Sequence, residues 1–462
     1  MNNPSRPAWR PAARCLRPGR LTRRQFLVHS SASLAAIQIV PGAVLGLQGA
    51  TPPNSRLQIA CIGVAGRGAA NLSGVRGESV VALCDVDTAR MASARSAHPQ
   101  AKTFQDYRAL LDQMGPSIDA VTISTPDHTH AAVAMDAIRR GKHVYCEKPL
   151  AHSIHEVRQL VQAARRHRVV TQLGNQGHSS DTIRTFREWI QDGAIGNVHT
   201  IHAASSANHC KIDQLPLLRE KHPVPDSLDW DLWLGPAQHR PYHPAYLPGK
   251  WRGWMPFGCG AIGDWVCHVV DPSFWALDLG SPIAIRAEAR NYDPVRHADT
   301  FPAGSVVTFE FPARGSRGPV RLVWHDGVEK LPRPAELDPD DQVPPTGAIV
   351  IGDRGAILHG SHGAGGLRLI PDAKMDAYRR PPKTLPRVPG HHADWLDAIR
   401  KGGSPGSRFD YGGPLTEIAL LGIIAIRCLG TRLEWDGAAG RFTNHPPANQ
   451  LLRPEFRPGW GL

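Results

Sequence analysis

The stretch LQIACIGVAGRG, residues 57–68, predicts how the folded part of the chain begins. A mostly apolar run of strand length leads into three glycines that fall within six residues. A strand, a glycine-rich turn and a helix start bind the pyrophosphate of a dinucleotide, because glycine admits the phosphates and the helix N-terminus carries partial positive charge. The pattern departs from G-x-G-x-x-G at Ala65, and an ordinary strand–helix turn is the alternative interpretation. The predicted turn comprises Gly63, Ala65, Gly66, Arg67 and Gly68.

A second apolar run, residues 79–85, ends in an acid. Asp85 lies 22 residues after Gly63, close to the spacing at which a carboxylate reaches the ribose hydroxyls of a dinucleotide. Such a carboxylate repels a 2′-phosphate, which favours NAD over NADP. Further strand-like runs, the first at 120–124 and the last at 169–173, alternate with helical stretches. This alternation predicts a doubly wound parallel sheet with right-handed crossovers.

Length, charge and cysteine usage exclude several classes of protein. At 462 residues the chain is long enough for two domains, each with its own core. The net charge of +12 is uneven, because seven arginines and no acid occur in the first 24 residues. No basic helix face alternates with aromatic residues, so we expect no nucleic-acid partner. The eight cysteines form no C-x-x-C pair and show no zinc-type spacing, so we predict neither a disulfide framework nor a metal site.

The N-terminal segment has the pattern of an export signal. Arg23 and Arg24 precede Phe26-Leu27 and a moderately apolar stretch that serines and Pro41 interrupt. This arrangement resembles a twin-arginine signal and makes a poor membrane-spanning helix. We therefore predict that residues 1–52 are a signal and linker, that the export machinery is a partner, and that the protein is periplasmic or membrane-anchored on the outer side. A disordered basic tail is the alternative, and no clean A-x-A sequence marks a cleavage site.

The rhythm of the predicted elements divides the remaining chain in two. Residues 53–178 carry the alternating strands and helices and form the predicted dinucleotide-binding domain. Longer strand-like runs, such as 305–311, are then separated by loops rich in Pro and Gly. They predict an α+β domain with an antiparallel or mixed sheet over residues 179–462. Helical stretches return at 391–430, and we expect them to pack back towards the first domain.

A second constellation of polar residues lies at 260–271, where Asp264 and His268 stand four apart. On a helix they project from one face, and a carboxylate beside an imidazole makes a general base that works near neutrality. A structural pair is the alternative. Lys148 follows the predicted strand 143–146, so we expect it at the carboxyl edge of the sheet, where ligands bind. A solvated surface lysine is the alternative there.

Together these features resemble the glucose–fructose oxidoreductase/inositol dehydrogenase/MocA (Gfo/Idh/MocA) family. The resemblance rests on the glycine-rich turn, Asp85, the sequence Glu147-Lys148-Pro149 and the D-x-x-x-H pair, and it covers residue 57 to the C-terminus. It is closest to the exported, twin-arginine branch, which carries tryptophan-rich segments like 230–236 and 251–254. The resemblance implies an α/β protein with an N-terminal Rossmann domain that binds NAD, with NADP less favoured. It also implies a C-terminal domain whose open, mostly antiparallel sheet often mediates homo-oligomers.

The resemblance implies an NAD(P)-dependent oxidoreductase that transfers hydride between a hydroxyl carbon of a sugar or cyclitol and the nicotinamide. His268 would take the hydroxyl proton, Lys148 would stabilise the alkoxide, and Asp264 would orient His268 or a second hydroxyl. An NAD-dependent glycoside hydrolase or lyase, which oxidises its substrate transiently and eliminates a substituent, is the alternative. A binding protein that holds the cofactor without turnover is a third reading.

The resemblance also assigns residues to the two ligands. Beyond the turn, the expected cofactor-binding residues are Asp85, Ser124, Pro126, His128, His130, Glu147, Lys148 and Asn175. The expected substrate residues, each with packing as its alternative role, are His178, Trp251, Arg252 and Trp254.

Overall fold

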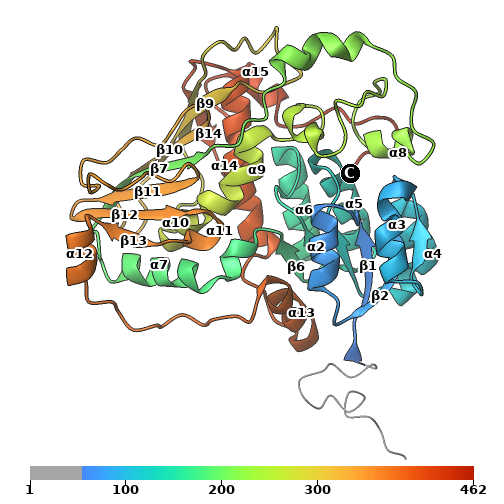
Figure 1. The fold of residues 1–462 in the computed structure, drawn as a ribbon, viewed down its shortest axis with the longest axis horizontal. Coiled ribbons are helices and arrows are strands. Elements are labelled where there is room, and N and C mark those ends of the chain that lie inside the picture. The colour runs from blue at the N-terminus through green and yellow to red at the C-terminus, as the bar shows by residue number, and fades with distance from the viewer. Residues whose placement is uncertain (1–54) are drawn as a thin grey trace, which may run out of the picture. The chain divides into compact units, whose positions relative to one another are not determined.

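The computed structural model describes residues 55–462, and the predicted export signal lies outside the described residues. The first domain is built on a six-stranded sheet in the order β3-β2-β1-β4-β5-β6, with every neighbouring pair parallel. This arrangement confirms the predicted doubly wound sheet (Figure 1). The strands are β1 (Gln58–Ile62), β2 (Ser79–Cys84), β3 (Lys102–Phe104), β4 (Ala120–Ile123), β5 (His143–Cys146) and β6 (Thr171–Leu173).

Helices connect these strands, and short polar side chains begin several of them. Asp87 starts α3 by accepting the N–H groups of Ala89 and Arg90. Ser153 starts α6: its hydroxyl oxygen accepts the N–H of Glu156, and its O–H donates to the Glu156 carboxylate. The helices of this domain are α2 (Arg67–Gly74), α3 (Thr88–Ala97), α4 (Tyr107–Met114), α5 (Asp127–Arg139) and α6 (Ile154–His167).

The second domain contains a nine-stranded sheet in the order β13-β12-β11-β7-β10-β9-β8-β14-β15. Only β7 and β10 pair in parallel among the described strands of this sheet, so the predicted mostly antiparallel sheet is confirmed. The strands are β7 (Val198–Ser205), β8 (Ala284–Glu288), β9 (Gly304–Phe311), β10 (Val320–Gly327), β11 (Gly347–Gly352), β12 (Gly355–Gly360), β13 (Arg368–Ile370), β14 (Leu433–Asp436) and β15 (Arg441–Phe442).

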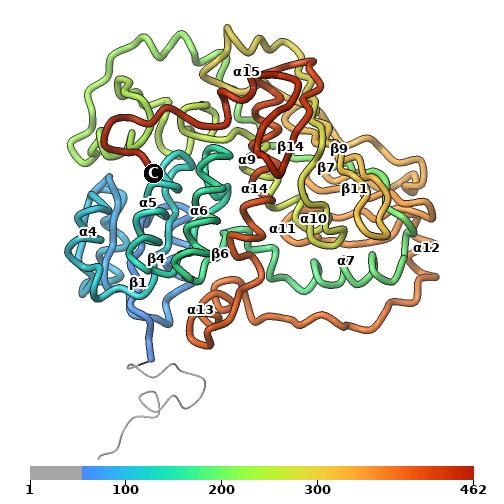
Figure 2. The backbone as a smooth tube through the Cα atoms, turned by 180° about the vertical axis from the view of Figure 1, so that it is seen from behind, coloured from blue at the N-terminus to red at the C-terminus, as the bar shows by residue number. Residues whose placement is uncertain are grey.

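The helices of the second domain join its sheet to the first domain. Helix α14 packs against α9 and β8 on one side and against α6 and β6 on the other (Figures 1 and 2). Among the described residues, it alone has the length and hydropathy of a membrane span, and 72% of that window is buried, as in a core helix. The helices are α7 (Asp181–Gln191), α8 (Trp230–Leu234), α9 (Gly260–Val269), α10 (Asp271–Ala276), α11 (Ser361–Ala364), α12 (Asp372–Ala377), α13 (His391–Lys401), α14 (Phe409–Arg427) and α15 (Pro446–Gln450).

Residues 206–258, between β7 and α9, form what we call the roof segment. Its interior is a cluster of aromatic side chains around Trp230, Trp233 and Trp254. Its backbone is tied to the loop after β2, because the N–H of Thr88 donates to Ser227 and the N–H of Asp229 donates to Val86. The roof segment therefore spans from the second domain to the first.

Candidate active site

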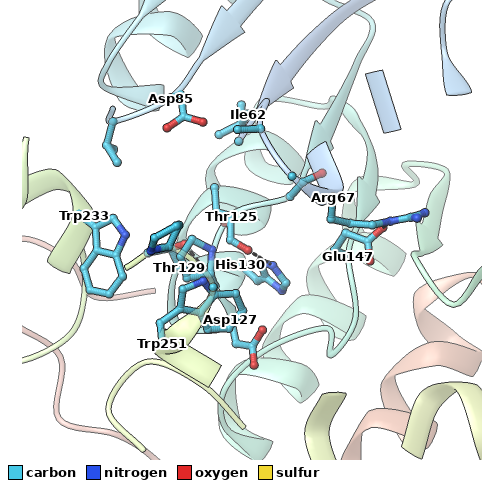
Figure 3. A pocket seen from close by; sticks show the side chains of 18 of the residues that line it. Ile62, Arg67, Asp85, Thr125, Asp127, Thr129, His130, Glu147, Trp233 and Trp251 are labelled. Atoms are coloured by element: carbon cyan, nitrogen blue, oxygen red, sulfur yellow. Dashed lines mark hydrogen bonds and ion pairs between the residues drawn. The ribbon is translucent and has the colours of Figure 1, made fainter. Parts of the chain in front are cut away.

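A cavity of about 600 Å³ lies at the carboxyl edge of the parallel sheet, between this sheet, helix α9 and the roof segment. Figure 3 shows Asp85 and Trp233 on one side of it and Arg67 with Glu147 on the other. We call the part around Asp85, Leu228 and Trp460 the Asp85 end. The part lined by Lys148, Asp264, His268 and His362 is the Lys148 end.

The glycine-rich turn borders this cavity with backbone groups. Gly63 has a φ of +77°, and a Cβ at Gly68 would overlap the carbonyl oxygen of Gly63, so helix α2 packs directly on the turn. Gly66, with a φ of +57°, is the N-cap of α2, and no side chain caps this end. An uncapped helix N-terminus beside a glycine turn offers N–H donors and room to an anion. This part of the cavity therefore fits the pyrophosphate of a dinucleotide.

Asp85 is held in place by backbone donors. Its carboxylate oxygens accept the N–H groups of Val64 and Asp87, each at 3.1 Å, and the side chain borders the cavity. Burial raises the pKa of Asp85 above its usual value, while these bonds and Arg90 oppose the rise. The acid at the end of the second strand is thus positioned to accept bonds from ribose hydroxyls, as the spacing predicts.

Glu147 is the centre of a buried hydrogen-bond network beside the turn. A single carboxylate oxygen accepts from Arg67 Nε at 2.9 Å, Asn71 Nδ2 at 2.9 Å and Gln176 Nε2 at 3.1 Å. Glu147 therefore neutralises Arg67 and links α2, β5 and the turn after β6. Arg67 and Glu147 both line the cavity. The three hydrogen bonds to the Glu147 carboxylate described above come from side chains of the protein itself.

Three more predicted residues, Ser124, Pro126 and His130, line the cavity from the loop after β4 and the start of α5. Both ring nitrogens of His130 lie 2.8 Å from carbonyl oxygens, those of Pro149 and Thr125. His130 thus fixes the backbone next to Lys148.

The Lys148 ammonium and the Asp264 carboxylate form an ion pair across the two domains. Lys148 Nζ donates to Asp264 Oδ1 at 2.5 Å and to its main-chain oxygen at 2.8 Å. The carboxylate also accepts from His209 Nε2 at 3.2 Å and Arg252 Nε at 3.3 Å. Burial opposes ionisation, but these cations and donors hold the pKa of Asp264 well below its usual value. Within the described residues no hydrogen bond joins Asp264 to His268, so Asp264 orients Lys148 rather than His268.

His268 lies one helical turn beyond Asp264 on α9 and is only 5% exposed. Burial, followed by the charges of Lys148 and His362, lowers its pKa well below 6.5. Its Nδ1 is buried and has no hydrogen-bond partner among the described residues. Burial thus favours the neutral imidazole, which is able to accept a proton, and it moves the pKa of this base down from the near-neutral range that the sequence predicts.

Two residues predicted at the site, His128 and Trp254, support the roof segment and do not line the cavity. The ring nitrogens of His128 approach the carbonyl oxygens of Phe257 and Trp233, and burial lowers its pKa to about 3. The Trp254 indole donates to the carbonyl of Ala245 at 2.9 Å. Both side chains point into packed interior, which for Trp254 is the packing role that the sequence left open.

Asn175 and His178 also lie away from the cavity lining. Asn175 Nδ2 donates to Asp271 at 3.1 Å, and His178 Nδ1 lies 3.0 Å from the other oxygen of the same carboxylate. Asp271 begins α10, and Tyr411 of α14 also donates to it. The turn after β6 thus directs both side chains into a buried contact between the domains. Their position in the sequence did not predict this direction.

Of the predicted substrate residues, Trp251 and Arg252 line the cavity, and the guanidinium of Arg252 lies 4.3 Å from the Trp251 ring. Sequence reasoning missed several lining residues. They include Arg90, Asp127, Trp233, Trp265, His362 and Trp460. Of these residues, His362 alone has a signal in the sequence, because it stands in the histidine- and glycine-rich stretch HGSHGAGG at 359–366.

Two groups of side chains in the described chain have metal-ligating atoms close together, and neither lies at the Lys148 end. They are Glu220, His222 and His243, and Asp338, Asp341 and Asp372. Arg368 already forms ion pairs within the second group. In the first group, His243 Nδ1 already accepts the Ala245 N–H, so the neutral ring carries its proton on Nε2. Neither group is therefore built as a cation site.

The fold and the cavity define a two-domain protein whose Rossmann sheet carries a dinucleotide site at its carboxyl edge. The chain belongs to the Gfo/Idh/MocA oxidoreductase family. The family model described as an oxidoreductase family with an NAD-binding Rossmann fold matches residues 57–175. The model for the C-terminal alpha/beta domain of the same family matches residues 182–311, so the two cover more than half of the chain. The first domain is thus an NAD-binding Rossmann domain, as the sequence predicted.

Among curated relatives, the chain is 26% identical over 215 residues to levoglucosan dehydrogenase of Pseudarthrobacter phenanthrenivorans, covering 46% of this chain and 45% of that protein. It is 30% identical over 179 residues to glycosyl hydrolase family 109 protein 2 of Akkermansia muciniphila, covering 36% of each. The matches thus span less than half the length of these relatives. A solved structure of an inositol dehydrogenase homolog from Azotobacter vinelandii, complexed with NADH and myo-inositol, covers 82% of this chain and 98% of its own at 17% identity, with a TM-score of 0.53.

Proposed function

We propose that this protein is an NAD-dependent oxidoreductase that acts on a hydroxyl-bearing carbon of a sugar or cyclitol. The observation that carries the proposal is the Lys148 end, where an ammonium and a neutral imidazole line the same cavity as the glycine turn and Asp85. Relatives named for sugar and inositol oxidation support the substrate class. Bound NAD supplies the acceptor for the hydride.

The residues at the Lys148 end divide the proton chemistry between them. A ring nitrogen of His268 accepts the hydroxyl proton, because its low pKa keeps the imidazole neutral. Two of the three N–H bonds of Lys148 are directed at Asp264, which leaves the third for the substrate oxygen as negative charge develops on it. Trp251 and Trp265 offer apolar faces that exclude water and stack on a sugar ring.

The test is to incubate the purified protein with NAD and a panel of aldoses, anhydrosugars and cyclitols, and to follow NADH by its absorbance. We expect NADH to accumulate with at least one substrate class, and Lys148→Met to lower that rate. The variant His199→Asn, an exposed histidine on β7, is the control and should keep the wild-type rate. Absence of NADH with every compound, from protein shown to bind NAD, would contradict the proposal.

NAD-assisted hydrolysis or elimination is the second candidate. It draws on the relative named as a family 109 glycosyl hydrolase and on the roof segment, whose backbone bonds enclose the Asp85 end and would hinder cofactor exchange. Aryl glycosides distinguish the two candidates. Release of the aryl group without net NADH favours hydrolysis, whereas NADH formation from the free sugar favours oxidation.

We further propose that the protein is exported by the twin-arginine route and that it acts as a homo-oligomer. The export proposal draws on Arg23-Arg24 before Phe26-Leu27, and the oligomer proposal on the family resemblance alone. Replacing both arginines by lysine should retain the protein in the cytoplasm, as cell fractionation measures. Light scattering of the purified protein checks the oligomer, and a monomer would contradict it.

A further inference from the structure

The Lys148 end contains a second imidazole that no motif indicated. The ring of His362 stacks on that of His268, with centroids 4.1 Å apart and an interplanar angle of 22°. Trp265 meets both rings edge-on, at 5.7 Å from His362 and 6.0 Å from His268. His362 lies in α11, a single kinked turn between β12 and β13 and almost a hundred residues after His268, so the contact joins separate parts of the second domain.

The backbone that presents His362 is held in an uncommon conformation. His362 has φ 56° and ψ 53°, in the left-handed region that residues other than glycine rarely adopt. Hydrogen bonds from another part of the chain hold its neighbour Gly363. The hydroxyls of Ser180 and Thr182 donate to the Gly363 carbonyl oxygen at 3.1 and 2.6 Å. A Cβ at Gly177 would overlap the carbonyl carbon of His362. The turn is therefore held against the start of α7 and the residues just before it, and strain kept by its surroundings is typical of functional positions.

Charged and titratable groups face His268 from every side that packs on it. Lys148 comes from the end of β5, Arg67 from the start of α2 and Asp264 from the same helix, and His362 stacks on one face of the ring. The Nδ1 of His268 has no partner among the described residues, and parallel rings cannot share an in-plane hydrogen bond. Stacking by His362, with Trp265 edge-on to both rings, thus limits rotation of the His268 ring.

We propose that His362 is a positioning residue for the base: its ring holds the His268 imidazole in its cavity-facing plane and keeps it neutral. Two features combine in this role. The stacked ring excludes water from one face of His268, and a second imidazole beside it disfavours a proton on either ring. This proposal deepens the proposed oxidoreductase function, and it rests on that function only for its kinetic readout.

Two variants separate the effect of the stacked ring from that of the left-handed backbone conformation. Asn tolerates the left-handed conformation, so His362→Asn removes the ring with the least change to the turn. His362→Phe keeps a stacked ring and removes the second titratable group. His199→Asn, on the exposed face of β7, is the matched histidine control.

The first readout needs no activity. In protein labelled at histidine, the His268 signal, assigned by its loss in His268→Asn, is titrated by NMR in each variant. We expect the His268 pKa to rise towards 6.5 in His362→Asn, by about one unit or more, and to rise less in His362→Phe. An unchanged His268 pKa in His362→Asn, with the fold intact by circular dichroism, would overturn the proposal whatever the substrate is.

The second readout is kinetic. In His362→Asn we expect kcat to fall roughly 10-fold while the affinity for NAD stays unchanged, because a mis-set base loses only part of the roughly 10²–10⁴-fold contribution of acid–base catalysis. The acid limb of the kcat/KM profile should move up in pH together with the NMR pKa. A shift by NMR without an effect on rate would reject His362 as a positioning residue and leave it as a wall of the cavity.

Discussion

The two ends of the cavity are built differently. At the Asp85 end, the first domain supplies the glycine turn and the strand-end acid from within 23 residues, and backbone N–H groups hold the carboxylate. At the Lys148 end, residues 148, 264, 268 and 362 come from three distant segments, and side chains hold one another through an ion pair and a ring stack. One βαβ unit supplies the glycine turn and Asp85 of the first end, which the roof segment and Trp460 then wall, whereas the second end needs side chains of both domains for its charged groups.

This difference predicts how each end responds to substitution. A change at the Asp85 end should alter affinity and cofactor choice but leave the chemical step intact. A change at the Lys148 end should alter the chemical step with little effect on cofactor affinity, because its charged groups balance one another. The following substitutions test that division, in order of decreasing expected effect.

The largest effect is expected for His268→Ala. Loss of a positioned base should cut turnover roughly 10²–10⁴-fold, while NAD binding survives because the ribose and pyrophosphate contacts belong to the other end. The wild-type rate should fall only when the pH drops well below 6.5, since burial and Lys148 depress the pKa of His268. That acid limb should vanish in the variant. Full activity of His268→Ala at pH 7 would reject the base assignment.

The sequence predicted the first domain well because its signals are local. Strand-length apolar runs, Asp87 as the cap of α3 and the glycine turn each depend on neighbours in the chain. The Lys148 end could be predicted only in part. Lys148 follows from its place after β5, but the partner of Asp264 is Lys148 rather than His268, because the α9 carboxylate faces the first domain.

The remaining errors have two different physical causes. Asn175 and His178 follow β6 at the ligand edge of the sheet, but the buried Asp271 carboxylate needs donors and draws both side chains inwards. His362 was missed for the opposite reason. Nothing in its local sequence predicts that a left-handed turn after β12 brings its ring onto His268.

The second-largest effect is expected for Lys148→Met, which removes the ammonium but keeps most of the side-chain volume. We expect turnover to fall roughly 10- to 100-fold, the worth of one charged hydrogen bond in the transition state. Asp264 remains ionised, because Arg252 and His209 still contact it, so the fold should persist. The loss should not add fully to that of His268→Ala, since both groups act on one hydroxyl. Full additivity in single-turnover rates would indicate separate roles.

At the other end, Asp85→Arg should weaken NAD binding roughly 10-fold and improve NADP binding, because a cation replaces the carboxylate at the ribose. Asp85→Asn is the matched control, which removes the charge but can still accept the Val64 N–H. We expect it to weaken NAD without a gain for NADP. Calorimetric titration of both cofactors measures this, and equal affinities in wild type and Asp85→Arg would leave Asp85 as a strand-end acid only.

The smallest effect is expected for Trp460→Ala, which opens the wall of the Asp85 end. Trp460 is 8% exposed, lines the cavity and lies 4.3 Å from the guanidinium of Arg108 on α4. Arg457, which precedes it, pairs with Asp231 of α8, so the C-terminal residues and the roof segment close this end together.

Removing one stacked aromatic wall should cost about 1 kcal/mol and raise the dissociation rate of NADH about 5-fold, as stopped-flow displacement measures. The rate of the chemical step in single turnover should not change, because Trp460 belongs to the Asp85 end. Trp275→Ala is the matched control: that ring also stacks on an arginine, Arg187 at 4.4 Å, but does not line the cavity. If Trp460→Ala slowed the chemical step and left the NADH dissociation rate unchanged, the two ends of the cavity would not act separately.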